Sequence, residues 1–261
     1  MDLGEQLREQ LSEDVRLRTL ARFHAHRQAW AANPALRALY QRWYAQVRAQ
    51  LPDPRLGRWI EIGSGPGLAQ QLIPELELSD VVQAPWHAHQ LAAEALPFGE
   101  GQVGALVLFD VLHHLRSPAR FLAEATRVLA PGGRVVLCEP YVSPLSFPIY
   151  RFLHEEGCDL SVDPLASQTS GASTNDPFEG NQGIPTLMFG RHRRELERRF
   201  PSLRLTKLER LAGPSYPASG GFSGRPLPGP LFRVLLAIED RLPAMAFRLI
   251  GFRLLAVLER V

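Results

Sequence analysis

The stretch RWIEIGSGPG at residues 58–67 constrains the fold more than any other part of the chain. Its apolar first half, residues 59–62, is bounded by turn residues, which is typical of a strand buried in a sheet that is covered on both faces. Glycine then occupies every second position, at Gly63, Gly65 and Gly67. Glycine permits positive φ and lets a ligand approach the backbone without meeting a Cβ atom. The stretch therefore predicts a buried strand followed by a turn suited to ligand binding.

This segment has three possible interpretations. It is one of two kinds of nucleotide-binding loop, or it is a glycine-rich turn that binds no ligand. A dinucleotide loop of a nicotinamide-dependent oxidoreductase requires G-x-G-x-x-G, but the third glycine position is taken by Leu68. The pattern E-x-G-x-G-x-G, which starts at Glu61, instead resembles motif I of class I S-adenosylmethionine-dependent methyltransferases. Their cofactor carries a sulfonium and an ammonium and no phosphate, so an acidic residue beside the loop suits it.

A short helix and a second strand are expected after the loop. Pro66 suits a first helical turn, and Leu68 and Leu72 would share one face of a helix that Pro74 ends. Residues 76–80 alternate in polarity and end at Asp80. In an open parallel sheet, ligands bind beyond the carboxyl ends of the strands. The resemblance implies that Asp80 accepts hydrogen bonds from the ribose hydroxyls; the alternative is an ordinary turn aspartate.

The segment from residue 92 to 115 extends the resemblance to the UbiE-like, or type 11, group of methyltransferases. Its L-P-F at residues 96–98 and V-L-H-H at residues 111–114 match that group. Ala92 and Gly104 depart from it, because the group has aspartate at both positions. The resemblance implies a cofactor site made of nine residues. These are Glu61, Gly63, Ser64, Gly65, Gly67, Asp80, Ala93, Glu94 and Asp110.

Strand and helix patterns alternate along residues 58–140, as expected of βαβ units. A strand is predicted at 105–109, a helix opened by Ser117 and Pro118, and a strand at 134–139. Later segments predict a helix at 191–199, a sixth strand at 203–208, a helix at 231–242 and a final strand at 251–261. The resemblance implies a Rossmann-like α/β class I methyltransferase fold. Its seven-stranded, mostly parallel sheet would have the order 3-2-1-4-5-7-6, with the seventh strand antiparallel and helices on both faces.

The domain organisation follows from the same patterns. Residues 1–55 form an N-terminal helical segment with two helices separated at Asn33 and Pro34. Residues 56–261 form the methyltransferase domain, with insertions at about 141–190 and 212–250, in a single domain overall. Insertions of this length are usually lids or binding elements. Apolar side chains of the second insertion are candidates for contact with a membrane surface or another subunit.

The composition of the chain limits which kinds of partner and which cell compartment are expected. The chain has 261 residues, a formal net charge of +2 and 45% hydrophobic residues. Such a balance gives no electrostatic case for nucleic acid, and no segment is suited to span a membrane. The two cysteines and the charged N-terminus favour a reducing compartment without a signal peptide, so the cytoplasm is expected. His24 and His26 have no cysteine or acidic partners at metal spacing, and no metal site is predicted.

The expected reaction is transfer of a methyl group from S-adenosylmethionine to a small-molecule or lipid-like acceptor, with oxygen as the preferred acceptor atom. His114 and His154 are the candidate general bases, because histidine titrates near neutrality. Tyr150, which would share a helical face with His154, and Glu139 complete the catalytic candidates. A non-catalytic relative that keeps the fold as a binding or scaffold module is the alternative that Ala92 and Gly104 encourage.

Overall fold

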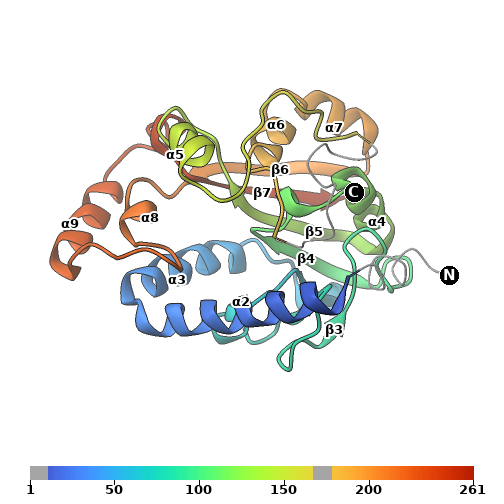
Figure 1. Ribbon diagram of the computed structural model, residues 1–261. Helices are drawn as coiled ribbons and strands as arrows, with labels where there is room; N and C mark the ends of the chain where they lie inside the picture. The colour runs from blue at the N-terminus through green and yellow to red at the C-terminus, as the bar shows by residue number, and fades with distance from the viewer. Residues whose placement is uncertain (1–10, 167–177) are drawn as a thin grey trace.

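The computed structural model describes residues 11–166 and 178–261. Seven strands form one sheet in the order β3-β2-β1-β4-β5-β7-β6 (Figure 1), which confirms the predicted fold class. The strands are β1 (Arg58–Ile62), β2 (Glu77–Asp80), β3 (His89–Gln90), β4 (Val103–Phe109), β5 (Leu129–Pro140), β6 (Leu203–Leu211) and β7 (Arg253–Arg260).

Strand direction also follows the prediction. Strands β1 to β5 pair in parallel, and β7 lies antiparallel between β5 and β6. The chain order reverses between β1 and β4, which are neighbours with Ile62 opposite Leu108. The carboxyl ends of these two strands form a topological switch point, where open α/β sheets bind ligands.

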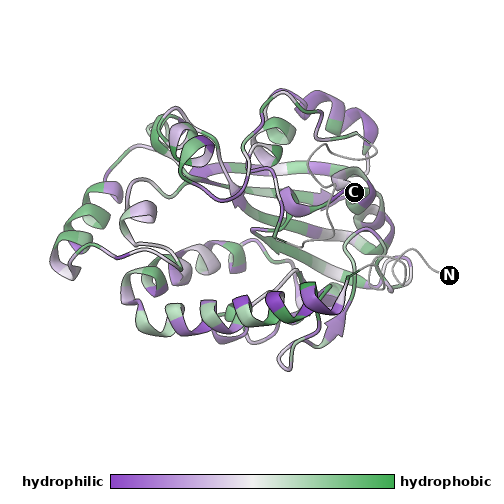
Figure 2. Ribbon diagram, viewed as in Figure 1, coloured by the Kyte–Doolittle hydropathy of each residue, from purple (hydrophilic) through white to green (hydrophobic). Residues whose placement is uncertain are grey.

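Helices cover both faces of the sheet (Figure 1). The helices near the sheet are α2 (Glu13–Ala32), α3 (Pro34–Arg48), α4 (Pro118–Val128), α5 (Ser146–Phe152), α6 (Ile184–Phe189), α7 (Arg193–Arg199), α8 (Ser215–Ala218), α9 (Gly229–Glu239) and α10 (Phe247–Ile250). Most residues of the central strands are hydrophobic, whereas most residues of α7 are hydrophilic (Figure 2). The two predicted N-terminal helices are therefore confirmed as far as residues 11–50 are concerned; the first ten residues lie outside the described ranges.

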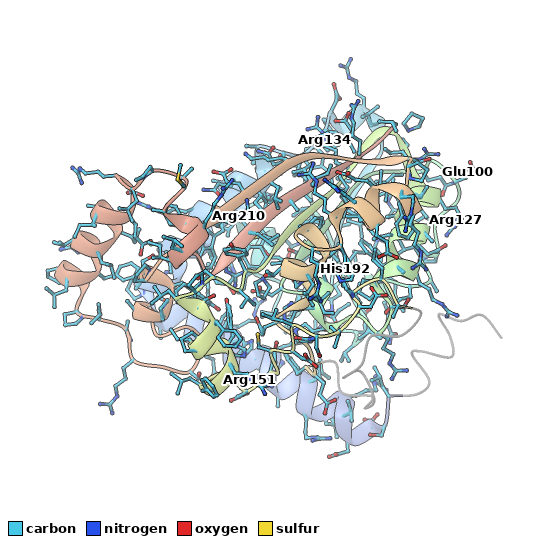
Figure 3. The ribbon with its side chains drawn as sticks, turned by 90° about the horizontal axis from the view of Figure 1, so that it is seen from above. Glu100, Arg127, Arg134, Arg151, His192 and Arg210 are labelled. Carbon is cyan, nitrogen blue, oxygen red and sulfur yellow. The ribbon has the colours of Figure 1, made fainter. Side chains whose placement is uncertain are left out.

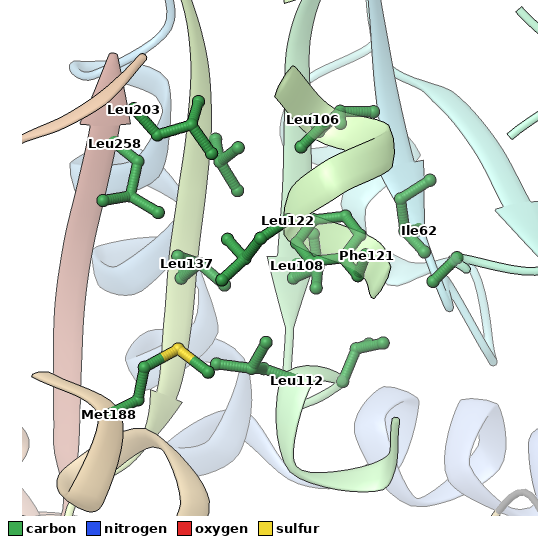
Figure 4. Packing of buried hydrophobic residues seen from close by; sticks show 14 of the residues in the cluster. Ile62, Leu106, Leu108, Leu112, Phe121, Leu122, Leu137, Met188, Leu203 and Leu258 are labelled. Carbon is green, nitrogen blue, oxygen red and sulfur yellow. The ribbon is translucent and has the colours of Figure 1, made fainter. Parts of the chain in front are cut away.

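Alternate residues of each strand pack on opposite faces of the sheet. On one face, Ile62, Leu108 and Leu137 pack with Phe121 and Leu122 of α4 (Figure 4). On the other face, side chains of β4, β5 and β7 pack against α3 and α9. That second cluster includes Val107, Phe109, Val136, Cys138, Leu255, Val257, Tyr40, Trp43, Phe232 and Leu236. Because both faces are covered, the central strand β4 is buried and apolar along its whole length.

Local sequence explains where several helices begin. The Asn33 side chain accepts a hydrogen bond from the backbone N–H of Leu36, and Ser117 does the same for Arg120. Proline follows each cap at the first helical position, where its missing N–H costs nothing. Arg134 of β5, labelled in Figure 3, pairs with Glu259 of β7 and donates to the carbonyl of Gln50 just after α3.

Three predicted boundaries were wrong. The segment after Gly67 is one 3-10 turn, Leu68–Gln71, because Pro74 and the start of β2 at Glu77 leave no room for further turns. β5 begins at Leu129, before the predicted Arg134, because Leu129 pairs with Val103 ahead of a register shift. Helix α5 ends at Phe152, so His154 lies beyond it. Among the described residues, no helix is both long enough and apolar enough to cross a membrane.

Candidate cofactor and acceptor site

The glycine loop after β1 is held at Gly65 by three side chains. The Gly65 backbone N–H donates to Oδ2 of Asp80 at 2.9 Å. Its carbonyl accepts from Trp86 Nε1 at 2.8 Å and from His87 Nε2 at 2.9 Å. Ser64 binds the same loop to β2, because its backbone N–H donates to the carbonyl of Ser79. The loop is therefore fixed in shape by the protein alone.

All three loop glycines have positive φ: +65° at Gly63, +49° at Gly65 and +68° at Gly67. Neighbouring side chains occupy the space that Cβ atoms at these positions would fill. A Cβ on Gly63 would lie 2.6 Å from Cγ2 of Val111, and one on Gly67 would collide with the Trp86 ring. Glycine is thus required here for both backbone conformation and close packing.

Asp80 ends β2 as predicted and lines the cavity beside the loop. Burial raises the pKa of its carboxyl group, and hydrogen bonds from Val82 and Gly65 oppose that effect. The Val82 N–H donates to Oδ1 at 3.0 Å. An ionised carboxylate has about four acceptor positions, so these two amides leave capacity for the hydroxyls of a ribose.

Glu61 lies behind the loop and does not line the cavity. The Tyr44 hydroxyl donates to its Oε1 at 2.7 Å, whereas Oε2 is buried without a hydrogen-bond partner among the described residues. Burial raises the pKa of Glu61 to about 7, although the bond from Tyr44 lowers it. Glu61 could therefore act on a ligand in the cavity only through its charge and not through direct contact.

The next part of the cavity wall, around Ala92 and Ala93, is apolar and buried. Glu94 accepts hydrogen bonds from the backbone N–H groups of Arg116 and Ser117 at 3.1 and 3.4 Å, so it fixes the turn before α4. Burial raises the pKa of Glu94. With alanine at position 92, this part of the wall offers an apolar surface rather than a second carboxylate.

Asp110 follows β4 and has φ of +57°. Both of its carboxylate oxygens accept from Arg253 of β7, at 2.7 and 2.5 Å. The Arg253 guanidinium lies over the rings of Trp43, Phe109 and Tyr216, between 4.4 and 5.0 Å from their centroids. Asp110 lines the cavity, as a cofactor role requires, but Arg253 holds its carboxylate.

Glu139 lies near the end of β5 and is fully buried. It accepts hydrogen bonds from the loop that follows the neighbouring strand β4. Its Oε1 accepts from the N–H groups of Val111 and Leu112, both at 2.8 Å. Its Oε2 accepts from Nδ1 of His113 at 2.8 Å. Burial alone lowers the pKa of His113, but the bonds to Glu139 and Glu156 outweigh it and raise that pKa to about 10. Glu139 is thus a positioning residue for His113.

His114 stacks beside His113, with ring centroids 4.1 Å apart. Its Nδ1 donates to the carbonyl of Glu179 at 3.1 Å, and its Nε2 lies 3.9 Å from Oε2 of Glu156. Burial and the neighbouring His113 lower the pKa of His114. Burial raises the pKa of Glu156, but the bond from His113 prevails and lowers it to about 2. These three residues all line the cavity.

The other catalytic candidates have defined partners. Tyr150 is buried, and its hydroxyl donates to the carbonyl of Phe252 at 2.7 Å. His154 packs edge-on against Tyr150, and its Nδ1 accepts from the N–H of Glu156 at 3.2 Å. Glu155 is exposed and pairs with Arg22 of α2. Tyr150 and His154 are thus brought together as expected, although they do not share one helix.

One cavity of about 1060 Å³ joins the two halves of the site. The loop residues and Asp80 line one part, and His113, His114 and Glu156 line another. Small-molecule sites are typically about 300–1,000 Å³, so the cavity has room for a cofactor and an acceptor together. Apolar side chains complete its wall. They include Phe109, Ile149, Leu153, Tyr216, Phe222 and Phe252.

This strand order, with a glycine loop after β1 and an acid ending β2, defines the class I methyltransferase fold. Residues 60–137 match the family described as "Methyltransferase domain". Residues 60–137 of this chain are therefore a methyltransferase domain, in a fold that S-adenosylmethionine-dependent class I methyltransferases share. The predicted family, fold and cofactor are confirmed at this level.

Relatives cover only part of the chain. Over 120 residues it is 34% identical to an uncharacterized 37.1 kDa protein in transposon Tn4556 from Streptomyces fradiae, across 38% of this chain and 35% of that protein. Over 91 residues it is 34% identical to a demethylmenaquinone methyltransferase from Tropheryma whipplei, across 32% of this chain and 38% of that enzyme. The chain thus spans little more than a third of the length of these relatives.

A solved structure of a SAM-dependent methyltransferase from Archaeoglobus fulgidus shares the fold. The two superpose with a TM-score of 0.50 at 15% identity, covering 86% of this chain and 94% of that one. At this identity the similarity concerns the arrangement of the strands and helices.

Sequence reasoning missed several side chains that shape the site. Trp86 and His87 follow β2 and hold Gly65, yet no motif marks them. His113 belongs to the V-L-H-H match at residues 111–114, yet only its neighbour His114 was predicted to act. Glu156 lies two residues beyond the predicted His154. Arg253 is distant in sequence and reaches Asp110 only through the sheet. An arginine directly before the apolar run at residues 254–258 was the available signal.

Proposed function

We propose that this protein transfers the methyl group of S-adenosylmethionine to an oxygen of a small or lipid-like acceptor. The observation that carries this proposal is the continuity of the cavity. It connects the glycine loop and Asp80 with a cluster of two histidines and a glutamate. When bound, S-adenosylmethionine supplies an activated methyl group. The protein then has to orient the acceptor, exclude water and take up a proton.

The cofactor half of the cavity has groups for each part of the ligand. Asp80 would accept from the ribose hydroxyls, and the backbone of residues 63–67 would pass alongside the amino-acid portion. The apolar surface at Ala92 and Ala93 would take the adenine. Glu61, with one oxygen unpaired, would add negative charge behind the loop. These roles use only groups that face the cavity or lie directly behind it.

The other half of the cavity supports the choice of acceptor. Its wall is rich in aromatic and aliphatic side chains, among them Phe109, Leu153 and Phe222. An apolar acceptor with one polar oxygen fits such a wall, because the apolar part gains from burial. Demethylmenaquinone, in the name of the Tropheryma relative, is a largely apolar molecule, so it supports a lipid-like acceptor but not the choice of oxygen as the acceptor atom.

Of the two candidate bases, the hydrogen bonds favour His114. The Nδ1 of His154 accepts a backbone N–H, so in the neutral ring its proton is on Nε2. The Nδ1 of His114 donates to a carbonyl, so its Nε2 has a lone pair. We therefore assign His114, rather than His154, to the acceptor end of the reaction.

The experiment combines calorimetric binding of S-adenosylmethionine with a turnover assay. Asp80→Ala should weaken binding by about 1.5–3 kcal/mol, the usual contribution of hydrogen bonds to a charged group. Asp53→Ala is the control, because Asp53 caps the turn before β1 and does not line the cavity. Equal affinity of the wild type and Asp80→Ala would remove Asp80 from the site.

Turnover is measured as release of S-adenosylhomocysteine with a panel of phenols, hydroquinones and prenyl alcohols. Methylated product with at least one acceptor is the expected result. Tight cofactor binding without turnover on any acceptor of the panel would instead support a non-catalytic binding module, the alternative that Ala92 and Gly104 encourage.

A further inference from the structure

The two adjacent histidines of the acceptor cluster are held in the same tautomer. Nδ1 of His113 bonds a carboxylate oxygen of Glu139, and Nδ1 of His114 bonds the carbonyl oxygen of Glu179. Both partners can only accept, so each Nδ1 carries a proton. In the neutral ring, Nε2 of His114 therefore has a free lone pair, whereas Nε2 of His113 carries a proton that it donates to Glu156 and that a bound metal ion would displace. The hydrogen bonds at Nδ1 turn both Nε2 atoms toward Glu156.

A carboxylate completes the group. Oε2 of Glu156 lies 3.1 Å from Nε2 of His113 and 3.9 Å from Nε2 of His114. The three ligand atoms all lie within 4.8 Å of one another. The amide of Gln182 contacts both Glu156 and His113. A largely buried carboxylate requires a positive charge beside it, and either the proton on His113 or a metal ion held by the three residues can supply that charge.

We infer that His113, His114 and Glu156 form a binding site for a divalent first-row transition-metal ion of the zinc type. Two imidazole nitrogens and one carboxylate oxygen are a typical set of zinc ligands, and such sites keep a further position open. Magnesium and calcium prefer all-oxygen surroundings, so this set disfavours them. This conclusion replaces the expectation from sequence that the chain has no metal site.

The surroundings of His113 support the inference. A histidine that binds a metal usually donates its other N–H to a carboxylate or a carbonyl, which fixes the ring and makes it a stronger ligand. Glu139 and the Glu179 carbonyl provide this second layer for both rings. Glu139 is itself fixed by two backbone N–H groups. The hydrogen bonds that hold the two histidine rings therefore start from β5 and the backbone, and none of them comes from an exposed side chain.

The ion's role, though not its binding, rests on the proposed function. The cluster lines the same cavity as the glycine loop, on the acceptor side. An ion there would select acceptors that offer an oxygen ligand, and it would lower the pKa of a bound hydroxyl group. The inference thus narrows the acceptor class to molecules with a metal-binding oxygen.

A second group with the same residue types provides a matched control. Asp163, His192 and Glu195 lie close together, and His192 is labelled in Figure 3. The Nε2 of His192 accepts from Arg191, so its proton faces the two carboxylates at Nδ1. That group offers no imidazole lone pair to a metal, and both of its carboxylates are substantially exposed. It should not bind an ion tightly.

The test is equilibrium dialysis of the chelator-treated full chain against Zn²⁺, followed by elemental analysis. Wild type and His192→Ala should retain the ion equally. His114→Ala and Glu156→Gln each change a ligand and should bind the ion more than about 100-fold more weakly, because changes to residues behind the ligands alone typically cost about 10–100-fold. Glu139→Gln should weaken binding less than either. Circular dichroism checks that each variant is folded.

Two results would overturn the inference. Either the wild type retains no Zn²⁺, or His114→Ala and Glu156→Gln retain as much Zn²⁺ as the wild type. The cluster would then hold a proton on His113 in place of the metal, and His114 would itself accept the acceptor's proton. Calorimetry with S-adenosylmethionine runs in parallel. Zinc binding without cofactor binding would contradict the proposed function alone, whereas cofactor binding without zinc would contradict this inference alone.

Discussion

Asp110 and Arg253 form a bidentate ion pair across the sheet, with N–O distances of 2.7 and 2.5 Å. Asp110 directly follows β4, and Arg253 is the first residue of β7. The Arg253 side chain is almost fully buried, and the Asp110 side chain is 31% exposed. Three aromatic rings surround the guanidinium. The pair fixes the end of β4, from which the acceptor cluster continues.

Arg253→Met should destabilise the fold, because it leaves the Asp110 carboxylate without its partner in an aromatic environment. The expected cost is at most about 3–5 kcal/mol, the range for fully buried pairs that lose one member, because solvent reaches the 31% of the Asp110 side chain that is exposed. Arg134→Met is the control, because the Arg134–Glu259 pair is more exposed and should contribute only about 0–1 kcal/mol. Urea unfolding measures both. Similar midpoints for the two variants would contradict a dominant role for the buried pair.

Gly63→Ala should destabilise the protein more than Gly101→Ala. Both glycines have similar positive φ, +65° and +68°, so both substitutions incur the left-handed backbone cost of roughly 1–2 kcal/mol. Only at Gly63 would the new Cβ meet Val111, at 2.6 Å, whereas Gly101 has open space. Overpacking should add about 1–3 kcal/mol. Thermal unfolding and cofactor calorimetry compare the two, and equal losses would show that Val111 moves aside freely.

The stability difference between wild type and Glu61→Gln should depend on pH in a defined window. Burial raises the pKa of Glu61 from 4.5 to about 7 in the folded protein. Between these values the unfolded chain has lost the proton and the folded chain retains it. This group therefore reduces stability as pH rises from about 4.5 to 7, and the reduction is complete above 7. Glu61→Gln should gain relative to the wild type over that window in urea titrations. A constant difference from pH 4 to 8 would mean that Glu61 ionises normally.

His114→Ala should lower turnover far more than cofactor affinity, because His114 lies at the acceptor end of the cavity. Loss of proton handling typically costs about 100-fold or more in rate. His154→Ala is the comparison and should have a smaller effect, since the Nδ1 of His154 already accepts a backbone N–H. Rate measurements at saturating acceptor, with calorimetry for the cofactor, separate the two effects. An unchanged rate in His114→Ala would transfer the role to His154 or to no residue.

Much of the fold was predictable because it depends on short-range patterns. Apolar runs ended by glycine, proline or aspartate identified β1, β2 and β4, and the capping residues Asn33 and Ser117 marked helix starts. The strand order came from the resemblance rather than from the patterns. Boundaries failed where tertiary contacts decide them. β5 extends back to Leu129 because that residue finds a partner on β4.

The sequence by itself determined the strand at residues 58–62, the glycine turn that follows it and the acid that ends β2, because these features depend on backbone conformation and chain spacing over a few residues. Only the tertiary structure decided which side chains meet. Glu139 reaches His113 because the parallel strands β4 and β5 end at one edge of the sheet, and Arg253 reaches Asp110 because the antiparallel strand β7 starts at that edge. Glu156 reaches both histidines from the segment after α5. Burial then sets the charge and hydrogen bonding of these groups, and burial is a property of the packed chain, not of any local segment.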